Sequence, residues 1–200
     1  MGFKEIFKNE KKNNIDKLIE YHLQNGGISR YEKFKWYYKH ILKEPIENDT
    51  IDRLGERFKR LMLNNMSNKK ILINETLDFI KYISRIIPIH VVSGSDQEEL
   101  REICRMLNID EYFTSITGSP KKKSILIKTL LKKYDYDPSK VIYIGDSLID
   151  LKSSKGNELK FIGYNNKTLA TISDLYLEEI NFIYKILSYE NDKVILNLPK

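Results

Sequence analysis

The first third of the chain has the hydrophobic pattern of helices alone. Apolar residues recur three and four positions apart in three segments, at residues 15–23, 31–42 and 51–62. The pair Gly26-Gly27 predicts the end of the first helix, and Ser29 with Glu32 predicts an N-terminal capping box for the second. We find no strand pattern before residue 70. The sequence therefore predicts an all-helical region at the N-terminus.

From about residue 70 the pattern changes to alternating strands and helices. Short apolar runs predict strands at residues 87–95, 113–119, 141–145 and 160–165. Helical periodicity predicts helices at residues 75–86, 100–107, 122–133 and 173–188. A short helix is expected after Asp146, and Ser95 with Glu98 predicts the N-terminal cap of an earlier helix. Such alternation is typical of a parallel sheet with helices on both faces, so we assign the region to the α/β class.

Chemistry in a parallel sheet collects at the carboxyl ends of the strands, and the segment "GDSLID" stands at such an end. Asp146 leaves the strand tip, and Asp150 follows in the first turn of the next helix. Mg²⁺ prefers hard oxygen ligands and usually takes one or two carboxylates, so the pair is a candidate metal site. Helix capping is the alternative, because acids are favoured in a first helical turn.

Two other segments at strand ends could bind a phosphate, but each also has a purely structural explanation. In "VVSGS", the hydroxyl of Ser93 and the free backbone N–H groups suit a phosphate, although Ser95 also explains the pattern as a helix N-cap. In "GSPKKKS", a lysine at a strand–helix junction can neutralise a phosphoryl group, although three lysines are also typical of a solvated helix start. Each signal is weak by itself.

The order of these motifs is more specific than any one of them. A strand-end Ser-Gly, a loop lysine about 30 residues later and a strand ending in Gly-Asp-Ser-x-x-Asp resemble motifs two, three and four of the haloacid dehalogenase-like (HAD) hydrolases. The segment "YHLQNGGISRYEKFKWYYKHIL" resembles the helical cap of a phosphoglycolate-phosphatase-like branch of that superfamily. The resemblance extends from about residue 3 to about residue 188. It implies a HAD-like Rossmannoid parallel sheet with an N-terminal all-helical cap.

The resemblance also implies a Mg²⁺-dependent phosphatase that acts on a small phosphate ester through an aspartyl-phosphate. In such an enzyme Ser93 and the Gly94 amide would bind the substrate phosphoryl group. Lys123 would balance charge around the nucleophile, and Lys122 is the alternative because the loop has three lysines in a row.

The same resemblance assigns the metal site and suggests a contact from the cap. Asp146 would bind Mg²⁺ directly, and Asp150 would bind it directly or through water. Arg30 and Lys33 follow the Gly-Gly turn and could bind a second anionic group of the substrate, although charges on a helix surface explain them too. The predicted catalytic residues are Ser93, Lys123 and Asp146.

One part of the family pattern is missing, the Asp-x-Asp motif that supplies the nucleophile. In the family it follows the first strand, which lies in the middle of the sheet between the strands that end here at Ser93 and Asp146. The only Asp-x-Asp, Asp135-Tyr136-Asp137, precedes the wrong strand and is rejected. We therefore expect a truncated chain that lacks its first strand and is inactive alone. The alternative is a non-catalytic HAD relative that binds a phosphorylated ligand or a protein partner.

The domain boundaries follow from these assignments. We expect a helical cap over residues 1–68, a HAD-like α/β core over 69–190, and a tail or edge strand over 191–200. Residues 193–198, "KVILNL", have the apolar run of a first motif, with Asn197 in place of an acid. They are therefore a candidate for the empty central position in the sheet, and an edge strand or frayed tail is the alternative.

Composition narrows the class of partner. A hydrophobic content of 41% and a charged content of 31% suit a soluble globular protein, and no apolar stretch approaches the roughly 20 residues that span a bilayer. The single cysteine excludes an internal disulfide and a zinc cluster, which favours the cytoplasm. The net charge of +6 suggests an anionic partner, but acids are interleaved with the lysines. We expect a small phosphorylated metabolite rather than nucleic acid or a membrane.

Overall fold

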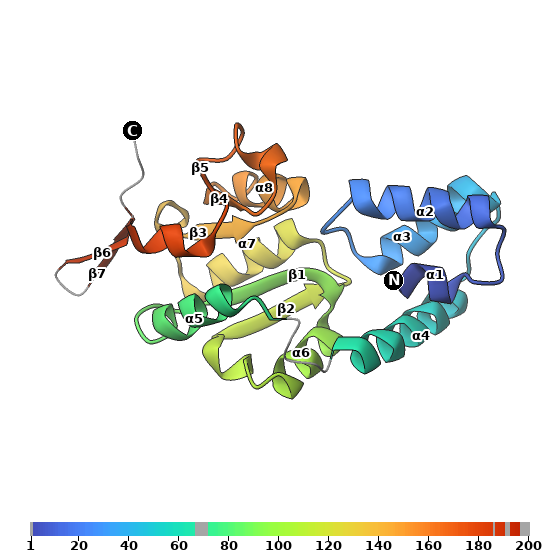
Figure 1. Cartoon of the computed structure of the whole chain (residues 1–200), viewed down its shortest axis with the longest axis horizontal. Helices are drawn as coiled ribbons and strands as arrows, with labels where there is room; N and C mark the ends of the chain where they lie inside the picture. Colours follow the sequence, from blue (N-terminus) through green and yellow to red (C-terminus); the bar gives the residue numbers. More distant parts are fainter. Residues whose placement is uncertain (1, 67–71, 186, 191–192, 197–200) are drawn as a thin grey trace.

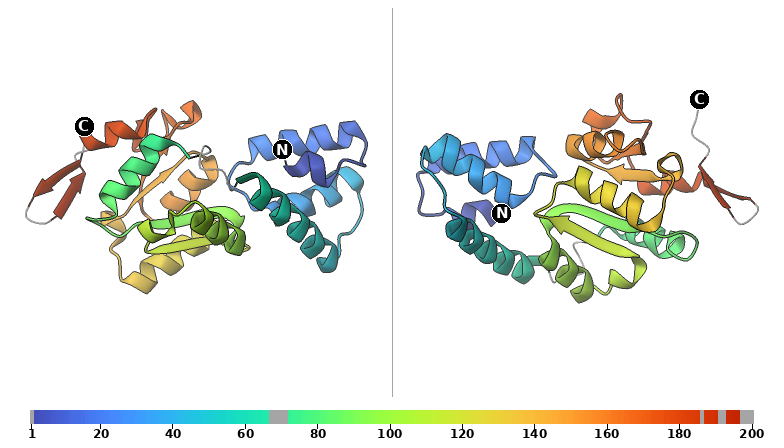
Figure 2. Two further views of the ribbon diagram at one scale, coloured as in Figure 1. Left: turned by 60° about the horizontal axis from the view of Figure 1, so that its bottom comes forward. Right: turned by 180° about the vertical axis from the view of Figure 1, so that it is seen from behind.

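The computed structural model describes residues 2–66, 72–185, 187–190 and 193–196. A group of helices over residues 2–66, called the cap below, lies beside an α/β region over residues 72–185, called the core (Figure 1). Figure 2 shows the same division from two further sides. The predicted α/β class with an N-terminal helical cap is confirmed.

The cap is built from helices whose apolar faces meet in an aromatic cluster. Its elements are α1 (Gly2–Ile6), α2 (Lys12–Gln24), α3 (Arg30–Tyr37), the π-helical turn η1 (Tyr38–Leu42) and α4 (Asn48–Met66). Phe34 of α3 is fully buried, and the rings of Phe3 and Phe58 from α1 and α4 pack against it. Ser29 caps α3 by accepting a hydrogen bond from the Glu32 amide at 3.3 Å, which is the serine half of the predicted capping box. The periodicity thus located α2, α3 with η1, and α4, but it did not indicate the short helix α1.

The core contains two parallel sheets flanked by helices. In one sheet β1 (His90–Asp96) pairs with β2 (Ser115–Ser119), and the other has the order β3 (Ile142–Gly145), β4 (Lys160–Tyr164), β5 (Leu175–Leu177). The helices are α5 (Asn74–Ile83), α6 (Gln97–Met106), α7 (Lys123–Tyr134) and α8 (Leu148–Lys155). Short 3-10 turns lie at η3 (Asp110–Tyr112), η4 (Pro138–Lys140), η5 (Lys167–Leu169) and η6 (Ile180–Lys185). β1 and β2 run toward the cap, so their carboxyl ends face it (Figure 1).

β1 and β3 are edge strands of the two sheets and are not paired with each other. Every residue of both strands remains partly exposed. A side-chain contact joins them, because the hydroxyl oxygen of Tyr143 in β3 lies 3.3 Å from the carbonyl oxygen of Val92 in β1. Among the described residues, no strand pairs with the free edges of β1 and β3. This is the position that the resemblance gives to the first strand of the family.

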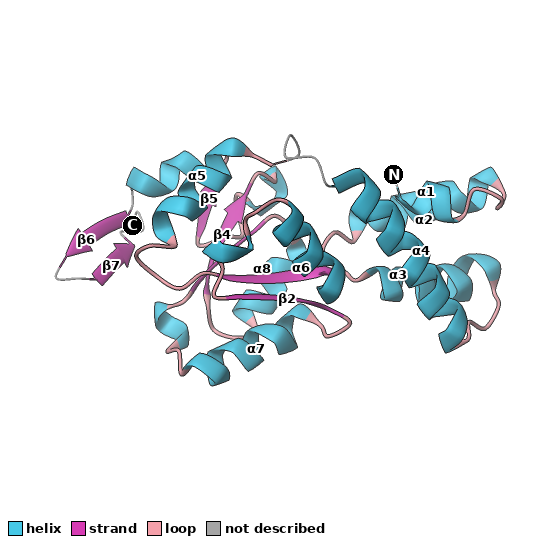
Figure 3. Cartoon of the chain, turned by 90° about the horizontal axis from the view of Figure 1, so that it is seen from below, coloured by secondary structure: helices cyan, strands magenta, loops and turns pink. Residues whose placement is uncertain are grey.

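The C-terminal segment does not fill that position. β7 (Lys193–Leu196) pairs antiparallel with β6 (Leu187–Glu190) in a separate two-stranded sheet. This hairpin lies at the end of the molecule opposite the cap (Figure 3). The hypothesis that residues 193–198 form the central strand is therefore wrong for the part that the structure describes, and Asn197 lies outside the described residues. A local hairpin closes a short loop, which costs less chain entropy than a crossover to the sheet centre.

The predicted helix over residues 173–188 is also wrong. Residues 175–177 form β5, which pairs with β4, and a 3-10 turn follows. The carboxylate of Asp174 accepts hydrogen bonds from the Phe161 amide at 2.7 Å and from the Lys155 ammonium, which holds this segment beside β4. Side-chain contacts made across the fold thus override the local helical periodicity.

The N-terminal cap of α6 lies one residue later than the sequence suggested. β1 extends to Asp96, and the Asp96 carboxylate accepts a hydrogen bond from the Glu99 amide at 3.1 Å. Ser95 instead belongs to the strand, and its amide donates to the Ser93 hydroxyl. The shift matters for the site below, because it places Glu99 rather than Glu98 at the third position of the helix.

Candidate active site

The turn between α2 and α3 brings the cap onto the strand ends of the core. Gly27 in this turn has a φ of 83°, a conformation that favours glycine. A Cβ atom on Gly27 would lie 2.7 Å from the Ser147 Oγ and 3.2 Å from the Lys123 Nζ. A Cβ atom on Gly94 would collide with the Gly27 carbonyl oxygen. The ends of β1 and β3 and the start of α7 therefore meet at one point under the cap.

Asp150 is the centre of a buried polar network at this point. Asp150 is only 2% exposed. Its Oδ1 accepts hydrogen bonds from the Lys123 ammonium at 2.6 Å and from the Tyr143 hydroxyl at 2.8 Å. Its Oδ2 accepts from the Ser147 amide at 3.2 Å and from the Ser147 hydroxyl at 2.6 Å. The capping box that Ser147 and Asp150 form is complete, so the capping explanation holds for Asp150.

Tyr143 is a member of this network that sequence reasoning missed. Burial raises the pKa of its hydroxyl above the ordinary value, and the adjacent negative charge of Asp150 raises it further. The hydroxyl therefore stays protonated and donates to Asp150. The signal in the sequence was a single polar tip within the apolar run "VIYIG", which is also the composition of an ordinary strand.

Asp146 differs from Asp150 in its surroundings. It is exposed, and its backbone carbonyl accepts a hydrogen bond from the Asn166 side chain at 2.6 Å. Its carboxylate forms no hydrogen bond or ion pair with the described residues. In the described part of the chain, no group of three or more His, Cys, Asp or Glu side chains is arranged to hold a metal ion. A Mg²⁺ ion that takes most of its ligands from water and substrate fits Asp146, whereas both oxygens of Asp150 are already engaged.

Ser93 and the lysine loop occupy the other sides of the site. The Ser93 hydroxyl accepts a hydrogen bond from the Ser95 amide at 3.1 Å, so its proton remains free to donate. Lys123 is the first residue of α7 and reaches Asp150, whereas Lys122 occupies the N-cap position of that helix. The geometry thus favours Lys123 over Lys122 as the site lysine.

Arg30 of the cap forms a buried ion pair with Glu99 of the core. Its two terminal nitrogens donate to the two carboxylate oxygens of Glu99 at 2.5 and 2.7 Å, and both side chains are buried. The guanidinium also lies over the Phe58 ring, 4.4 Å from its centre. A neighbouring contact joins the same elements, because the Tyr31 hydroxyl donates to Asp96 at 2.8 Å. This geometry contradicts the expectation that Arg30 binds substrate, since the pair would have to break first.

Lys33 is the buried cation of the cap. It is 3% exposed, and its ammonium lies 2.8 Å from the Nδ1 atom of His22 in α2. Burial lowers the pKa of Lys33 to about 8, and the positive charge of Lys123 contributes to the same shift. Burial and the charge of Lys33 also lower the pKa of His22. Nothing in the sequence indicates this contact, because the helical spacing of His22 is ordinary.

Replacing Lys33 with methionine is expected to change how stability depends on pH. Because the folded-state pKa is depressed, the folded protein binds fewer protons than the unfolded chain between about pH 8 and pH 10.5, so this lysine makes stability rise with pH there. Lys33→Met removes that rise and is expected to stabilise the protein below pH 8, by an amount on the order of 3 kcal/mol at most. Denaturant unfolding at several pH values measures the difference. Lys35→Met, at an exposed position of the same helix, is the control, and parallel curves for wild type and Lys33→Met would contradict the prediction.

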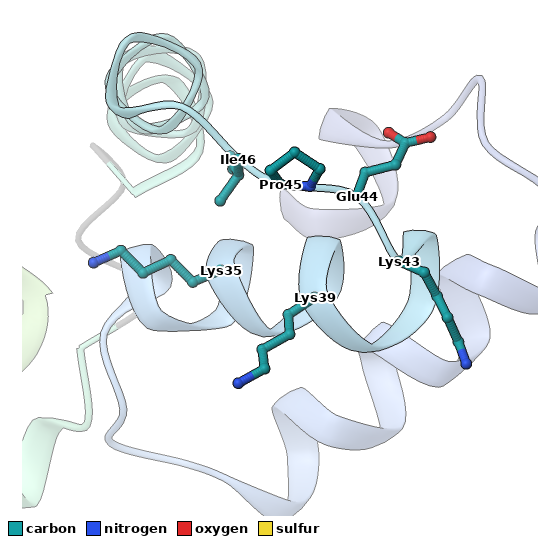
Figure 4. A pocket seen from close by; sticks show the side chains of 6 residues that line it. All are labelled: Lys35, Lys39, Lys43, Glu44, Pro45 and Ile46. Carbon is teal, nitrogen blue, oxygen red and sulfur yellow. The ribbon is translucent and has the colours of Figure 1, made fainter.

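A surface hollow elsewhere on the cap does not extend this site. It has a volume of about 470 Å³ and is lined by Lys35, Lys39, Lys43, Glu44, Pro45 and Ile46. The three lysine side chains point in different directions rather than toward a shared centre (Figure 4). The hollow therefore lacks the convergent donors of an anion site. No helix in the described residues is long and apolar enough to cross a membrane.

The fold is similar to that of several solved structures. The β-phosphoglucomutase PgmB of Clostridium difficile superposes with a TM-score of 0.70 at 15% identity, covering 92% of this chain and 87% of that chain. A predicted phosphoglycolate phosphatase of Haemophilus somnus 129PT has a TM-score of 0.66 at 17% identity, covering 92% and 88%. The HAD hydrolase YfnB of Bacillus subtilis, whose structure was determined bound to magnesium, has a TM-score of 0.65 at 15% identity, covering 92% and 88%.

The solved structures show the fold, whereas a comparison with protein families shows the family. A search of curated proteins finds no significant match. Residues 2–164, by contrast, match the haloacid dehalogenase-like hydrolase family, and this range includes the cap, β1 to β4 and every predicted site residue. The resemblance that the motif order suggested is thereby confirmed, and the chain belongs to the haloacid dehalogenase-like hydrolase family.

Proposed function

We propose that this fold serves a Mg²⁺-dependent phosphatase that acts on a small phosphorylated metabolite in the cytoplasm. The observation that carries the proposal is the meeting of Gly94, Lys123 and Ser147 at Gly27. Asp150 contacts Lys123 and Ser147, and Ser93 and Asp146 adjoin Gly94 and Ser147 in the sequence. A hydroxyl, backbone amides, an ammonium and a free carboxylate suit a phosphoryl group and a hard cation.

Each residue of the chain has a definite task in this proposal. The Ser93 hydroxyl and the Gly94 amide donate hydrogen bonds to phosphoryl oxygens. Lys123, held by Asp150, places positive charge where negative charge gathers in the transition state. Asp146 would hold the Mg²⁺ ion, which when bound offsets charge on the phosphoryl oxygens.

The attacking group in the proposed reaction is an aspartate carboxylate in the complete protein. Its oxygen bonds to phosphorus, the ester P–O bond breaks, and the leaving alkoxide takes a proton from water. Water or hydroxide then attacks the aspartyl-phosphate, which releases phosphate and regenerates the carboxylate. Among the described residues, the Asp-x-Asp segment does not offer an acid for this task. Asp135 ends α7 and Asp137 caps η4, so both lie at the start of β3, opposite the end that carries Asp146. We therefore infer that this polypeptide alone is inactive.

Metal binding by Asp146 tests the proposal without relying on turnover. The protein is expected to bind phenyl phosphate more tightly in the presence of Mg²⁺, and Asp146→Asn is expected to lower the affinity for Mn²⁺, used as a probe, by about tenfold or more. Calorimetry and the paramagnetic signal of free Mn²⁺ provide the two readouts. Asp52→Asn removes an exposed carboxylate on α4 and is the matched control. Equal metal affinity in wild type and Asp146→Asn would contradict the assignment.

One observation favours a second candidate function, a non-catalytic relative that binds a phosphorylated ligand or a protein partner. Asp150 is committed to a capping box and an ion pair, and such a network can be purely structural. This candidate predicts that phosphate esters bind but are not hydrolysed even when a nucleophilic strand is supplied, which the first experiment of the Discussion measures.

A further inference from the structure

Asp146 lies immediately after the last residue of β3 that pairs with β4. This last residue is Gly145, which lies opposite Gly163 in the parallel register. The Asp146 carbonyl accepts a hydrogen bond from the side-chain amide of Asn166 at 2.6 Å. Asn166 follows the end of β4 by two residues. Its side chain thus takes the place that a strand partner would have beside Asp146.

The Asn166 side chain is itself fixed by the loop after β4. Its Oδ1 accepts hydrogen bonds from the Thr168 amide at 3.2 Å and from the Thr168 hydroxyl at 2.8 Å, which makes Asn166 the N-cap of η5. The amide of Asn165 donates to the Leu177 carbonyl of β5 at 3.0 Å, which ties the same loop to the sheet. Because Thr168 holds the oxygen of Asn166, the nitrogen faces the Asp146 carbonyl.

The peptide group that joins Asp146 to Ser147 is held at both of its polar atoms. Its carbonyl belongs to Asp146 and is bound by Asn166, and its N–H belongs to Ser147 and donates to the Oδ2 atom of Asp150 at 3.2 Å. A trans peptide directs these two groups to opposite sides, so the two contacts restrain the group from both. The Asp146 carboxylate is exposed and has no hydrogen bond or ion pair with the described residues. Its direction therefore depends on this backbone.

We propose that Asn166 is a positioning residue, which orients the Asp146 carboxylate toward the metal ion by holding the Asp146 carbonyl. The inference rests on the proposed role of Asp146 in binding Mg²⁺. Residues that hold a metal ligand without touching the metal typically change the affinity by about 10- to 100-fold. Asn166 acts through the backbone rather than on the carboxylate itself, so we expect an effect near the lower end, of about five- to tenfold.

Mn²⁺ binding by the full polypeptide tests the role of Asn166. Asn166→Ala is expected to weaken binding by about five- to tenfold, measured from the paramagnetic signal of free Mn²⁺. In the metal-free protein, NMR relaxation of the Ser147 amide should show a more mobile backbone, because one of two restraints is gone. In an Asp146→Asn background, Asn166→Ala should leave the affinity unchanged within about twofold, since no carboxylate remains to be oriented.

Two further variants separate positioning from general stability. Asn157→Ala is the matched control, because the Asn157 amide also donates to backbone carbonyls, those of Ser124 at 3.1 Å and Ser153 at 2.8 Å, at the opposite end of α8. It should leave both the Mn²⁺ affinity and the backbone mobility next to Asp146 unchanged. Asn166→Ser keeps an oxygen for the cap of η5 but has no amide, and it should weaken Mn²⁺ binding should the alanine variant not fold.

The outcomes distinguish this role from the metal site itself. Equal Mn²⁺ affinity in wild type and Asn166→Ala would overturn the positioning role, while the metal site would stand if Asp146→Asn weakens binding. Equal losses in Asn166→Ala and Asn157→Ala would also overturn it, because the contact would then act through stability alone. Wild type that binds no Mn²⁺, or that binds it as tightly after Asp146→Asn, would overturn both this inference and the proposed metal site.

Discussion

Joining an apolar strand that ends in Asp-x-Asp to the N-terminus of this chain is expected to convert an inactive polypeptide into a Mg²⁺-dependent phosphatase. The free edges of β1 and β3 are parallel to one another in the family arrangement and lack a backbone partner among the described residues. An inserted strand would satisfy N–H and C=O groups whose burial unpaired costs about 1–3 kcal/mol each. The added aspartate would then arrive beside Ser93, Lys123 and Asp146.

The expected gain in rate is large because a covalent nucleophile is being supplied. Removing a nucleophile from an enzyme typically lowers the rate by several orders of magnitude, so we expect an increase of about 10³-fold or more in hydrolysis of p-nitrophenyl phosphate. A Cβ on Gly2 would press against the Phe58 ring, which makes this glycine a poor position for substitution in the fusion.

The control is the same strand with Asn-x-Asn at its end. It should raise the stability of the protein as much as the acidic version without raising the rate. Metal-dependent turnover by the unmodified 200-residue polypeptide would contradict the assignment of the missing nucleophile. A stabilised fusion that binds phenyl phosphate but does not hydrolyse it would favour the non-catalytic function.

Arg30→Ala is expected to lower the free energy of unfolding by about 3–5 kcal/mol. The substitution leaves the carboxylate of Glu99 buried without its bidentate partner, and that group is 1% exposed. It also removes the stacking of the guanidinium on Phe58. Chemical denaturation with tryptophan fluorescence measures the loss, since Trp36 lies in the cap.

A second ion pair between the cap and the core supplies the matched control. Lys59 of α4 lies 3.9 Å from Glu102 of α6, and both side chains are partly exposed to solvent. Lys59→Ala should therefore cost no more than about 1 kcal/mol. Equal losses of unfolding free energy in Arg30→Ala and Lys59→Ala would contradict the prediction that the buried pair contributes more to stability than the partly exposed one. Replacing Arg30 and Glu99 together by Met and Leu should recover most of the loss.

The cap helices and most strands could be predicted because their patterns are local. Helical spacing and the Ser29 cap located α2 and α3, and an apolar run located β3. The order of Ser93, Lys123 and Asp146 along the chain was also informative, because parallel strands bring their carboxyl ends together whatever the intervening sequence. These features need no knowledge of which side chains meet.

The remaining features depend on contacts between distant parts of the chain. Arg30 and Glu99 are 69 residues apart, so the role of Arg30 as half of a buried pair is invisible in its own helix. The strand β5 likewise follows from the contact of Asp174 with the Phe161 amide, 13 residues earlier. Helical spacing alone cannot show that Lys33 points inward and Lys35 outward, because both residues are lysines with similar neighbours in the sequence.

The packing of Gly27 on Gly94 has a consequence for ligand entry. A ligand group that lies against Gly94 would have to displace the turn, and that movement would strain the Arg30–Glu99 and Tyr31–Asp96 contacts. The measured affinity for such a ligand is then the intrinsic affinity multiplied by the fraction of molecules in which the turn is displaced. The contacts that stabilise the fold thus also oppose ligand binding. Weakening them would lower the stability of the protein and raise its affinity for such a ligand.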